Sequence, residues 1–170
     1  MAKSTRPPTH VAVDTNVPLD LAIERELVID ALGIIRRRTS TGPILIPPSV
    51  AQELAFIADR GEIAADRAAA SRFLRNHRDW EFQLVNYVPF GHEFIERIAE
   101  RVLDRGLLPK EEVHDAFILA EAALLNCSLL LTSDEHLRGI DFQRLTFELQ
   151  AFDVIAPVIA TPREIVAKFF

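Results

Sequence analysis

The 170-residue sequence predicts one α/β domain, a three-layer α/β/α arrangement around a mostly parallel sheet of about five strands. Short apolar runs bounded by turn residues alternate with longer segments of helical periodicity, which is the pattern of βαβ units. With 170 residues, 49% of them hydrophobic, the chain is long enough to bury one core and too short for two domains that each bury a core of their own. We therefore expect residues 1–170 to form a single domain, with residues 1–8 as a flexible tail.

Five segments have the character of short buried strands. Each is a run of apolar residues that ends at a turn signal. They are residues 10–13, 44–46, 82–88, 128–131 and, at an edge of the sheet, 154–155.

The segments between these strands repeat apolar residues with the helical period of about 3.6 residues. The first helix is expected over residues 27–37 and the second from Ser49, as N-cap, to Gly61. Further helices are expected over residues 62–75, from Phe94 to Gly106, over residues 110–126, and after Thr161, with Thr161 as N-cap and Pro162 at the first position.

Composition excludes several classes of protein. The chain has no apolar run long enough to span a bilayer and no apolar segment after its basic first residues, so we expect a soluble, cytoplasmic protein without membrane contact. Its one cysteine, Cys127, cannot form an internal disulfide, and its apolar surroundings in the sequence favour a buried, inert thiol.

The formal net charge of −6 argues against a protein whose whole surface coats nucleic acid. Basic residues are nevertheless clustered in two helical stretches. Solvated helix ends explain either cluster alone, because cations are favourable near a helix C-terminus. If the chain binds RNA, the expected contacts are Arg36, Arg37, Arg38, Arg72 and Arg75, the last two in a stretch that also contains Arg67, His77 and Arg78.

Two polar clusters follow predicted strands directly. Asp14 and Asn16 come after the first strand, and Thr132 and Asp134 come after the fourth. In open α/β sheets, ligands bind beyond the carboxyl ends of the strands, so both clusters occupy a favoured position for a site. The same residue types also cap turns and helix starts, which explains each cluster taken alone.

Two more carboxylates lie on helix faces that carry core residues. Glu53 follows Val50 by three residues and precedes Ile57 by four, and Asp115 shares a face with Ile118. A solvated position at the edge of the apolar stripe explains Glu53 alone. Asp115 requires a partner, because an unpaired buried charge is very costly, and stabilisation by the helix dipole explains it less well.

The order and local sequence of these acids resemble the PIN-domain family of metal-dependent ribonucleases, including the VapC-type toxins. The resemblance covers nearly the whole chain. It depends on an ordered set of four segments, VDTN at 13–16, PSVAQEL at 48–54, HDAFILAEA at 114–122 and LTSD at 131–134.

The resemblance implies a PIN-like fold and a ribonuclease that cleaves single-stranded or looped RNA. It also implies a catalytic acidic quartet with two supporting polar residues. By position these are Asp14, Glu53, Asp115 and Asp134, supported by Asn16 and Thr132. For a toxin, the family implies a small antitoxin protein as partner and a homodimer.

Carboxylates gathered about 4 Å apart repel by about 4 kcal/mol per pair at an effective dielectric of about 20, and a divalent cation relieves that repulsion. An all-oxygen donor set suits Mg²⁺ or Mn²⁺, and the sequence has no Cys/His cluster with zinc spacing. We expect Asp14, Asp115 and Asp134 to ligate the metal, and Glu53 or Asp134 to bind a second ion or to accept the proton of the attacking water.

His114 and His136 flank two of the acids. Neighbouring helical residues point about 100° apart, so we expect His114 to face away from the Asp115 pocket and assign neither histidine a role.

Two alternatives remain at this point. One is a phosphohydrolase of the haloacid dehalogenase type, with the first-strand aspartate as nucleophile, although such enzymes carry a second acid where this chain has Asn16. The other is a catalytically silent PIN-like module that binds RNA or a protein. The presence of all four acids argues against a catalytically silent module.

Overall fold

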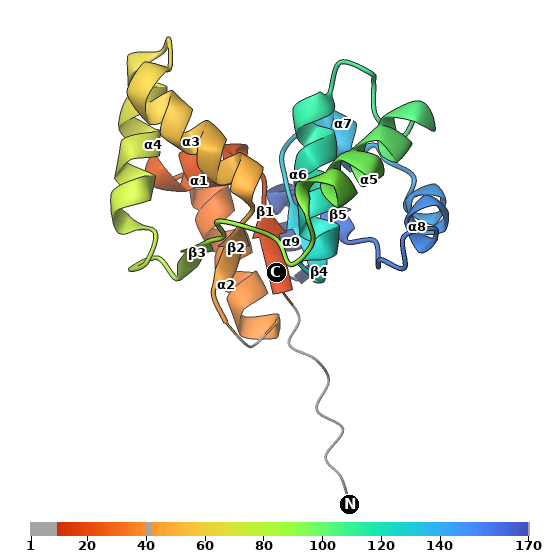
Figure 1. Ribbon diagram of the computed structural model, residues 1–170. Helices are drawn as coiled ribbons and strands as arrows, with labels where there is room; N and C mark the ends of the chain where they lie inside the picture. The colour runs from red at the N-terminus through yellow and green to blue at the C-terminus, as the bar shows by residue number, and fades with distance from the viewer. Residues whose placement is uncertain (1–9, 40–41, 170) are drawn as a thin grey trace, which may run out of the picture.

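The central sheet follows directly from the alternation of strands and helices. The computed structural model describes residues 10–39 and 42–169, so the predicted tail at 1–8 lies outside the described residues. Five strands form one sheet in the order β3-β2-β1-β4-β5, and every neighbouring pair is parallel (Figure 1). The strands are β1 His10–Val13, β2 Ile44–Ile46, β3 Phe82–Leu84, β4 Cys127–Leu131 and β5 Val158–Ala160. The predicted parallel α/β fold is confirmed.

Helices connect the strands and cover both faces of the sheet (Figure 1). On one face, α2 and α9 pack against each other, and on the other, α6 packs against β4, α3 and α5. The helices are α1 Asn16–Ala22, α2 Glu26–Arg38, α3 Pro48–Arg60, α4 Ala64–Asn76, α5 His92–Asp104, α6 Val113–Leu124, α7 Glu135–Arg138, α8 Phe142–Gln150 and α9 Pro162–Phe169. Within the described residues, no helix is both long and apolar enough to cross a membrane.

The predicted edge strand is wrong. Residues 154–155 follow Asp153, which has a φ of 56°, and Ile155 is 73% exposed. The strand instead forms after Pro157, where Val158–Ala160 pairs with β4. The third strand is also shorter than predicted and ends at Leu84, because its partner β2 offers only three residues to pair with.

The start of α3 differs from the expectation as well. Pro47 is the N-cap, Pro48 takes the first helical position, and the Ser49 side chain does not cap the helix. The cap expected at Thr161 is confirmed, since its hydroxyl accepts a hydrogen bond from the Glu164 amide at 3.1 Å. Three helices go beyond the sequence-based expectations: α1, α7 and α8, all short.

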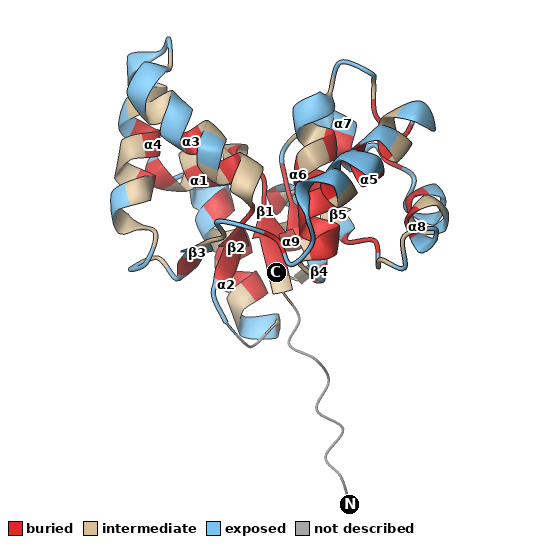
Figure 2. Cartoon of the chain, in the orientation of Figure 1, coloured by how far each residue is buried: buried red, intermediate tan, exposed pale blue. Residues whose placement is uncertain are grey.

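The core lies between the sheet and its helices, and the buried residues form one connected cluster (Figure 2). Cys127 belongs to it, and its burial raises the pKa of the thiol to about 12, as expected for an inert cysteine. Gly106 ends the α5 segment with a φ of +67°, a conformation that side-chain-bearing residues rarely adopt.

Register brings the two polar clusters together. Val13 at the end of β1 lies opposite Leu131 at the end of β4, and the Asp14 amide donates to the Leu131 carbonyl at 3.0 Å. Because the strands are parallel and adjacent, Asp14 and Thr132 leave the sheet side by side. Their meeting is therefore a consequence of topology.

Candidate active site

Asp14 is the buried centre of the site, with 5% of its surface exposed. Its Oδ2 accepts hydrogen bonds from the Thr132 hydroxyl at 2.7 Å and from the Asn16 amide at 2.8 Å. Its Oδ1 accepts one from the Thr15 backbone amide at 2.6 Å. An ionised carboxylate offers about four lone-pair positions, so three donors leave Oδ1 with one acceptor position to spare.

Asn16 and Thr132 orient the groups around Asp14. The Thr132 hydroxyl, on a fully buried residue, also accepts from the Asp134 amide at 2.9 Å. The Asn16 side-chain oxygen accepts from the Ser133 amide at 3.0 Å. These bonds join the segment after β1 to the segment after β4.

Asp134 has two roles in the geometry. It is the N-cap of α7, where its Oδ1 accepts from the Leu137 amide at 2.9 Å, so the capping explanation is correct for this residue. Its charge also raises the pKa of both Asp14 and Asp115. Asp134 therefore caps α7 and also acts through its charge on the other acids of the site.

Asp115 is the most perturbed acid of the group. Burial is the largest cause, and the charges of Asp14, Asp134 and Glu112 add to it, raising the pKa of Asp115 to about 7. The pKa of Asp14 is also raised, first by burial and then by Glu53 and Asp134, against the hydrogen bonds of Thr132 and Thr15. The folded chain thus holds carboxylates close enough to oppose each other's ionisation.

Glu53 reaches the site from α3. Its Oε2 accepts a hydrogen bond from the Thr15 hydroxyl and lies 2.8 Å from Nε2 of His114. The hydrogen bond to His114 is the main reason why the pKa of Glu53 lies below its ordinary value, and the same bond raises the pKa of His114.

The expectation that His114 has no place in the site is therefore wrong. The helical rule concerns only the angle between neighbours on α6, and the charges of His114 and Asp115 still shift each other's pKa. His114 also meets Glu53, which a different helix supplies. His136 lies 3.0 Å from Glu112 and has no contact with the quartet among the hydrogen bonds and ion pairs of the described residues.

Glu121 is a buried acid that sequence reasoning missed. It is 4% exposed on α6, and its carboxylate accepts from the Ser49 hydroxyl at 2.7 Å and the Ser49 amide at 2.9 Å. Glu121 therefore ties α6, which carries Asp115, to the start of α3, which carries Glu53. The signal was present, since Glu121 is a lone acid within an apolar helical run.

Glu53, Asp115 and Asp134 are each coupled to Asp14 through their charges, but the four acids do not form a preformed metal cage. Within residues 10–39 and 42–169, no three His, Cys, Asp or Glu side chains come close enough together to hold one metal ion. Mg²⁺ typically takes only one or two protein carboxylates and keeps several waters, so such a cage is not required of a magnesium site. The all-oxygen donors and the mutual repulsion of Asp14 and Asp115 fit a divalent cation.

The predicted RNA-binding arginines lie toward the amino ends of the strands, because α2 leads into β2 and α4 leads into β3. Arg36 and Arg72 both contact Trp80 there, since Arg36 donates to its carbonyl and the Arg72 guanidinium lies 5.7 Å from the centre of its ring. The run Arg36–Arg38 therefore lies opposite Asp14, and Arg37 and Arg38 are exposed. On α4, Arg72 is held by the Ala22 carbonyl at 2.7 Å and by Glu24 at 2.7 Å, and Arg75 is exposed.

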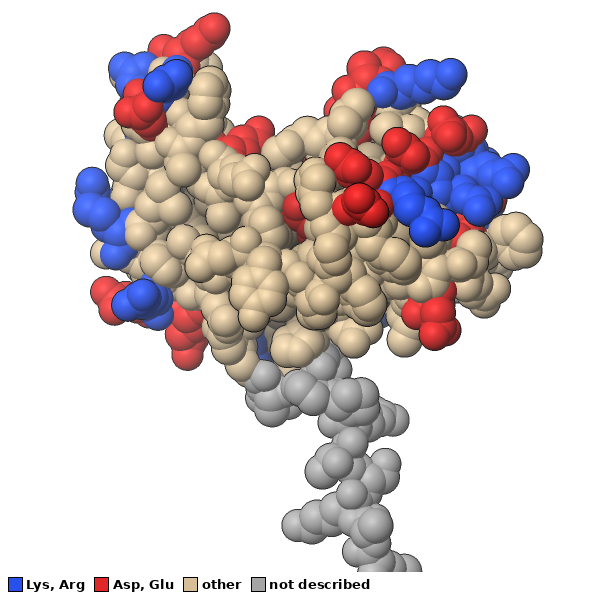
Figure 3. Space-filling view, viewed as in Figure 1, with Lys and Arg blue, Asp and Glu red and all other residues tan. Residues whose placement is uncertain are grey.

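A third group of basic residues lies on α5, where Lys and Arg side chains gather beside acids at one flank of the molecule (Figure 3). Arg97 and Arg101 are four residues apart on one face of α5, and Arg105 is the C-cap of that helix. Glu148 pairs with Arg101 at 3.2 Å and with Arg105 at 3.5 Å, and the Phe152 ring lies beneath Arg97 and Arg101. Two of these three arginines therefore share one carboxylate.

Comparison with known proteins identifies the family. The family model described as PIN domain matches residues 11–143, and the chain belongs to that family, whose members are generally nucleases. Membership decides against the haloacid dehalogenase alternative. A search of curated proteins gives no match.

Among solved structures, the fold is similar to a chain in the crystal structure of VapBC2 from Rickettsia felis bound to a DNA fragment from their promoter. The TM-score is 0.58 at 13% sequence identity, and the alignment covers 90% of this chain and 98% of that chain. At this identity the likeness shows the fold alone. It confirms the predicted PIN-like α/β fold.

Proposed function

We propose that this chain is a metal-dependent endoribonuclease of the PIN family. The observation that carries the proposal is the grouping of Asp14, Asp115 and Asp134 near the carboxyl ends of β1 and β4, where burial and then the charges of Asp14 and Asp134 raise the pKa of Asp115 to about 7. Such strain is costly in a purely structural cluster and is typical of sites that work on charged ligands.

A divalent metal, Mg²⁺ or Mn²⁺, would be held by Asp14 and Asp115, with Asp134 as a further ligand directly or through water. When bound, such an ion supplies charge neutralisation at the phosphodiester and lowers the pKa of bound water. Asp14 has a spare acceptor position at Oδ1, since Thr132 and Asn16 already donate to Oδ2. Those two donors keep the carboxylate in one orientation.

Glu53 is the proposed acceptor of the proton from the attacking water. Glutamate is ionised near neutral pH, and the Thr15 hydroxyl and His114 hold the Oε2 of Glu53 in place. His114 keeps a proton to a higher pH than usual, because Glu53 raises its pKa. The histidine therefore partners the carboxylate and balances part of the negative charge.

Single-stranded or looped RNA is the proposed substrate. Arg75 on α4 and Arg37 and Arg38 on α2 remain exposed for phosphate contacts, whereas Arg36 and Arg72 make contacts within the protein. Because Arg37 and Arg38 lie at the far end of the sheet, their RNA contacts would be distant from the cleaved bond. Arg75 lies in the last turn of α4, just before β3, and is therefore also at the amino ends of the strands, so loss of Arg75 and loss of Arg37 should weaken RNA binding to a similar extent.

A small antitoxin is the proposed protein partner, and a homodimer the proposed assembly. Support comes from the family and from the similar fold of a chain in the VapBC2 structure, which holds a DNA fragment from their promoter. An antitoxin that blocks the acidic site would need to cover Asp14 and Asp115.

The test is cleavage of an unstructured RNA by wild type and Asp14→Asn with Mn²⁺, with EDTA as the metal-free control. The expected result is Mn²⁺-dependent cleavage that the variant lowers at least about a hundredfold, in line with the removal of one key electrostatic group. Equal cleavage by both proteins would refute the assignment. Mn²⁺ binding without cleavage would favour the catalytically silent module.

A further inference from the structure

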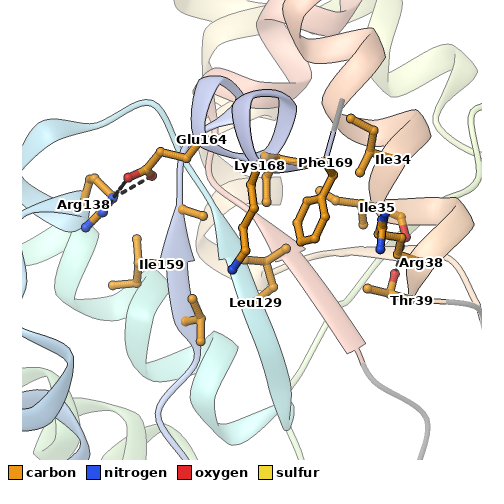
Figure 4. A pocket seen from close by; sticks show the side chains of 13 residues that line it. Ile34, Ile35, Arg38, Thr39, Leu129, Arg138, Ile159, Glu164, Lys168 and Phe169 are labelled. Atoms are coloured by element: carbon orange, nitrogen blue, oxygen red, sulfur yellow. Dashed lines mark hydrogen bonds and ion pairs between the residues drawn. The ribbon is translucent and has the colours of Figure 1, made fainter.

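A groove with apolar walls lies on the face of the sheet that α2 and α9 cover (Figure 4). Its volume is about 390 Å³, within the range of about 300 to 1,000 Å³ of many ligand pockets. No member of the acidic quartet lines it. Its walls come from the end of α2, from β4 and β5, and from α9, chiefly Ile34, Ile35, Leu129, Ile159, Ile165 and Phe169.

The groove is positively charged in a chain whose net charge is −6. Its described lining residues include three cations, Arg38, Arg138 and Lys168, and one acid, Glu164. Glu164 is already satisfied, because Arg138 donates to both of its oxygens at 2.7 Å and the Thr161 amide donates at 2.9 Å. The charge that remains available to a partner is therefore that of Arg38 and Lys168.

Arg38 and Lys168 converge on one aromatic ring. The guanidinium of Arg38 lies 4.4 Å from the centre of the Phe169 ring, and the ammonium of Lys168 lies 5.5 Å from it. Neither cation has a carboxylate partner among the ion pairs of the described residues. Figure 4 shows both side chains at the Phe169 end of the groove, while the Arg138–Glu164 pair lies at the other end.

The edge of the sheet runs along this groove. Among the described strands, β5 pairs only with β4, and Val158 at its start is 50% exposed. An edge strand presents backbone donors and acceptors to which an extended peptide can add as a further strand. Alternate side chains of such a peptide would face the apolar walls.

We propose that this groove binds an extended acidic peptide segment of a partner protein, with apolar side chains against Ile159 and Phe169 and carboxylates at Arg38 and Lys168. The positive charges of Arg38 and Lys168 favour a partner that carries negative charges. The branched aliphatic walls suit leucine- or valine-like side chains better than a sugar-phosphate backbone. A symmetric dimer across the groove would place the same cations of two copies close together, which is unfavourable.

The probe is a fluorescent, end-capped hexapeptide of alternating leucine and aspartate, and its control has lysine in place of aspartate. Fluorescence anisotropy should show the acidic peptide binding at least about tenfold more tightly than the lysine peptide. The charge-reversed variant Arg38→Glu/Lys168→Glu should weaken binding by about tenfold or more. The matched variant Arg75→Glu/Lys110→Glu, with the same change in net charge, should bind as the wild type does.

Methyl NMR of isoleucine locates the peptide. Addition of the acidic peptide should shift the methyl signals of Ile34 and Ile159 and leave those of Ile95 and Ile98 on α5 unchanged. If the double variant fails to fold, Val158→Asp at a half-exposed position tests the same groove and should also weaken binding.

Several outcomes would overturn the proposal. They are equal binding of the two peptides, no binding of either at millimolar concentration, unaltered binding by the Arg38→Glu/Lys168→Glu variant, or shifts confined to Ile95 and Ile98. A dimer that only this variant dissociates would assign the groove to a second copy. An RNA oligonucleotide that shifts Ile34 and Ile159 would assign it to nucleic acid. Nuclease activity affects none of these readouts.

Discussion

Replacement of Asp115 by asparagine should stabilise the metal-free protein while abolishing its proposed activity. The pKa of Asp115 is raised from 3.8 to about 7 by burial and by the charges of Asp14 and Asp134. At 1.36 kcal/mol per pKa unit, this shift corresponds to at most about 4 kcal/mol of opposition to the ionised form. The side chain is only partly buried, so solvent screening reduces the expected gain to about 1.5 kcal/mol.

The gain depends on pH in a defined direction. Below pH 3.8, Asp115 is neutral in both the folded and the unfolded chain, and its ionisation costs nothing. Between pH 3.8 and about 7, the unfolded chain loses this proton while the folded chain keeps it, so stability falls as pH rises. The full advantage of asparagine is therefore present at pH 8, and about a third of it at pH 5.

Thermal unfolding in EDTA measures this difference. For a chain of this size, about 1.5 kcal/mol corresponds to a rise in Tm of about 3 to 6 °C at pH 8. Asp79→Asn, at an exposed position, serves as the control and should leave the Tm unchanged. A variant that is equally or less stable than wild type at pH 8 would refute the electrostatic strain on which the site assignment depends.

Three other changes have defined outcomes. Glu121→Ala leaves the Ser49 amide and hydroxyl without their partner and should lower the free energy of unfolding by about 1 to 3 kcal/mol in urea titrations. Glu121→Gln should cost less than about 1 kcal/mol, and equal losses would contradict a stabilising tie between α6 and α3. His114→Ala should change the free energy of unfolding by less than about 1 kcal/mol, because the His114–Glu53 pair is partly exposed. The same variant should raise the pKa of Glu53 measured by NMR, and an unchanged pKa would disprove the contact. Cys127 should resist a thiol reagent at pH 8 until the chain unfolds, and rapid labelling of the folded protein would show that the thiol is not buried.

Much of the site could be predicted because parallel topology fixes where strands end. Asp14 and Asp134 each follow a strand, and adjacent parallel strands bring their carboxyl ends together. Glu53 and Asp115 were predictable as acids on apolar helix faces. The sequence could thus indicate carboxylates whose charges influence one another, although not the distances between them.

Contacts between helices could not be predicted in the same way. The pairing of His114 with Glu53 depends on how α3 and α6 lie against each other, and periodicity describes only one helix at a time. The separation of Arg38 from the acidic site follows from the direction of α2 relative to the sheet, which the local sequence does not contain.

The edge strand illustrates a different limit. Residues 154–155 and Val158–Ala160 are both short apolar runs, and periodicity cannot choose between them. The choice is made by pairing with Leu129–Leu131 on β4. Such pairing is a long-range property, so short edge strands are difficult to locate from sequence.

The most direct test of the proposed metal site is the position of Mn²⁺ in crystals of the protein soaked with the ion, located by its anomalous scattering. We predict a peak within ligand distance of the carboxylates of Asp14 and Asp115 that is lost in Asp14→Asn. The absence of a peak between these two aspartates at saturating Mn²⁺, or a peak that persists in the variant, would contradict the assignment.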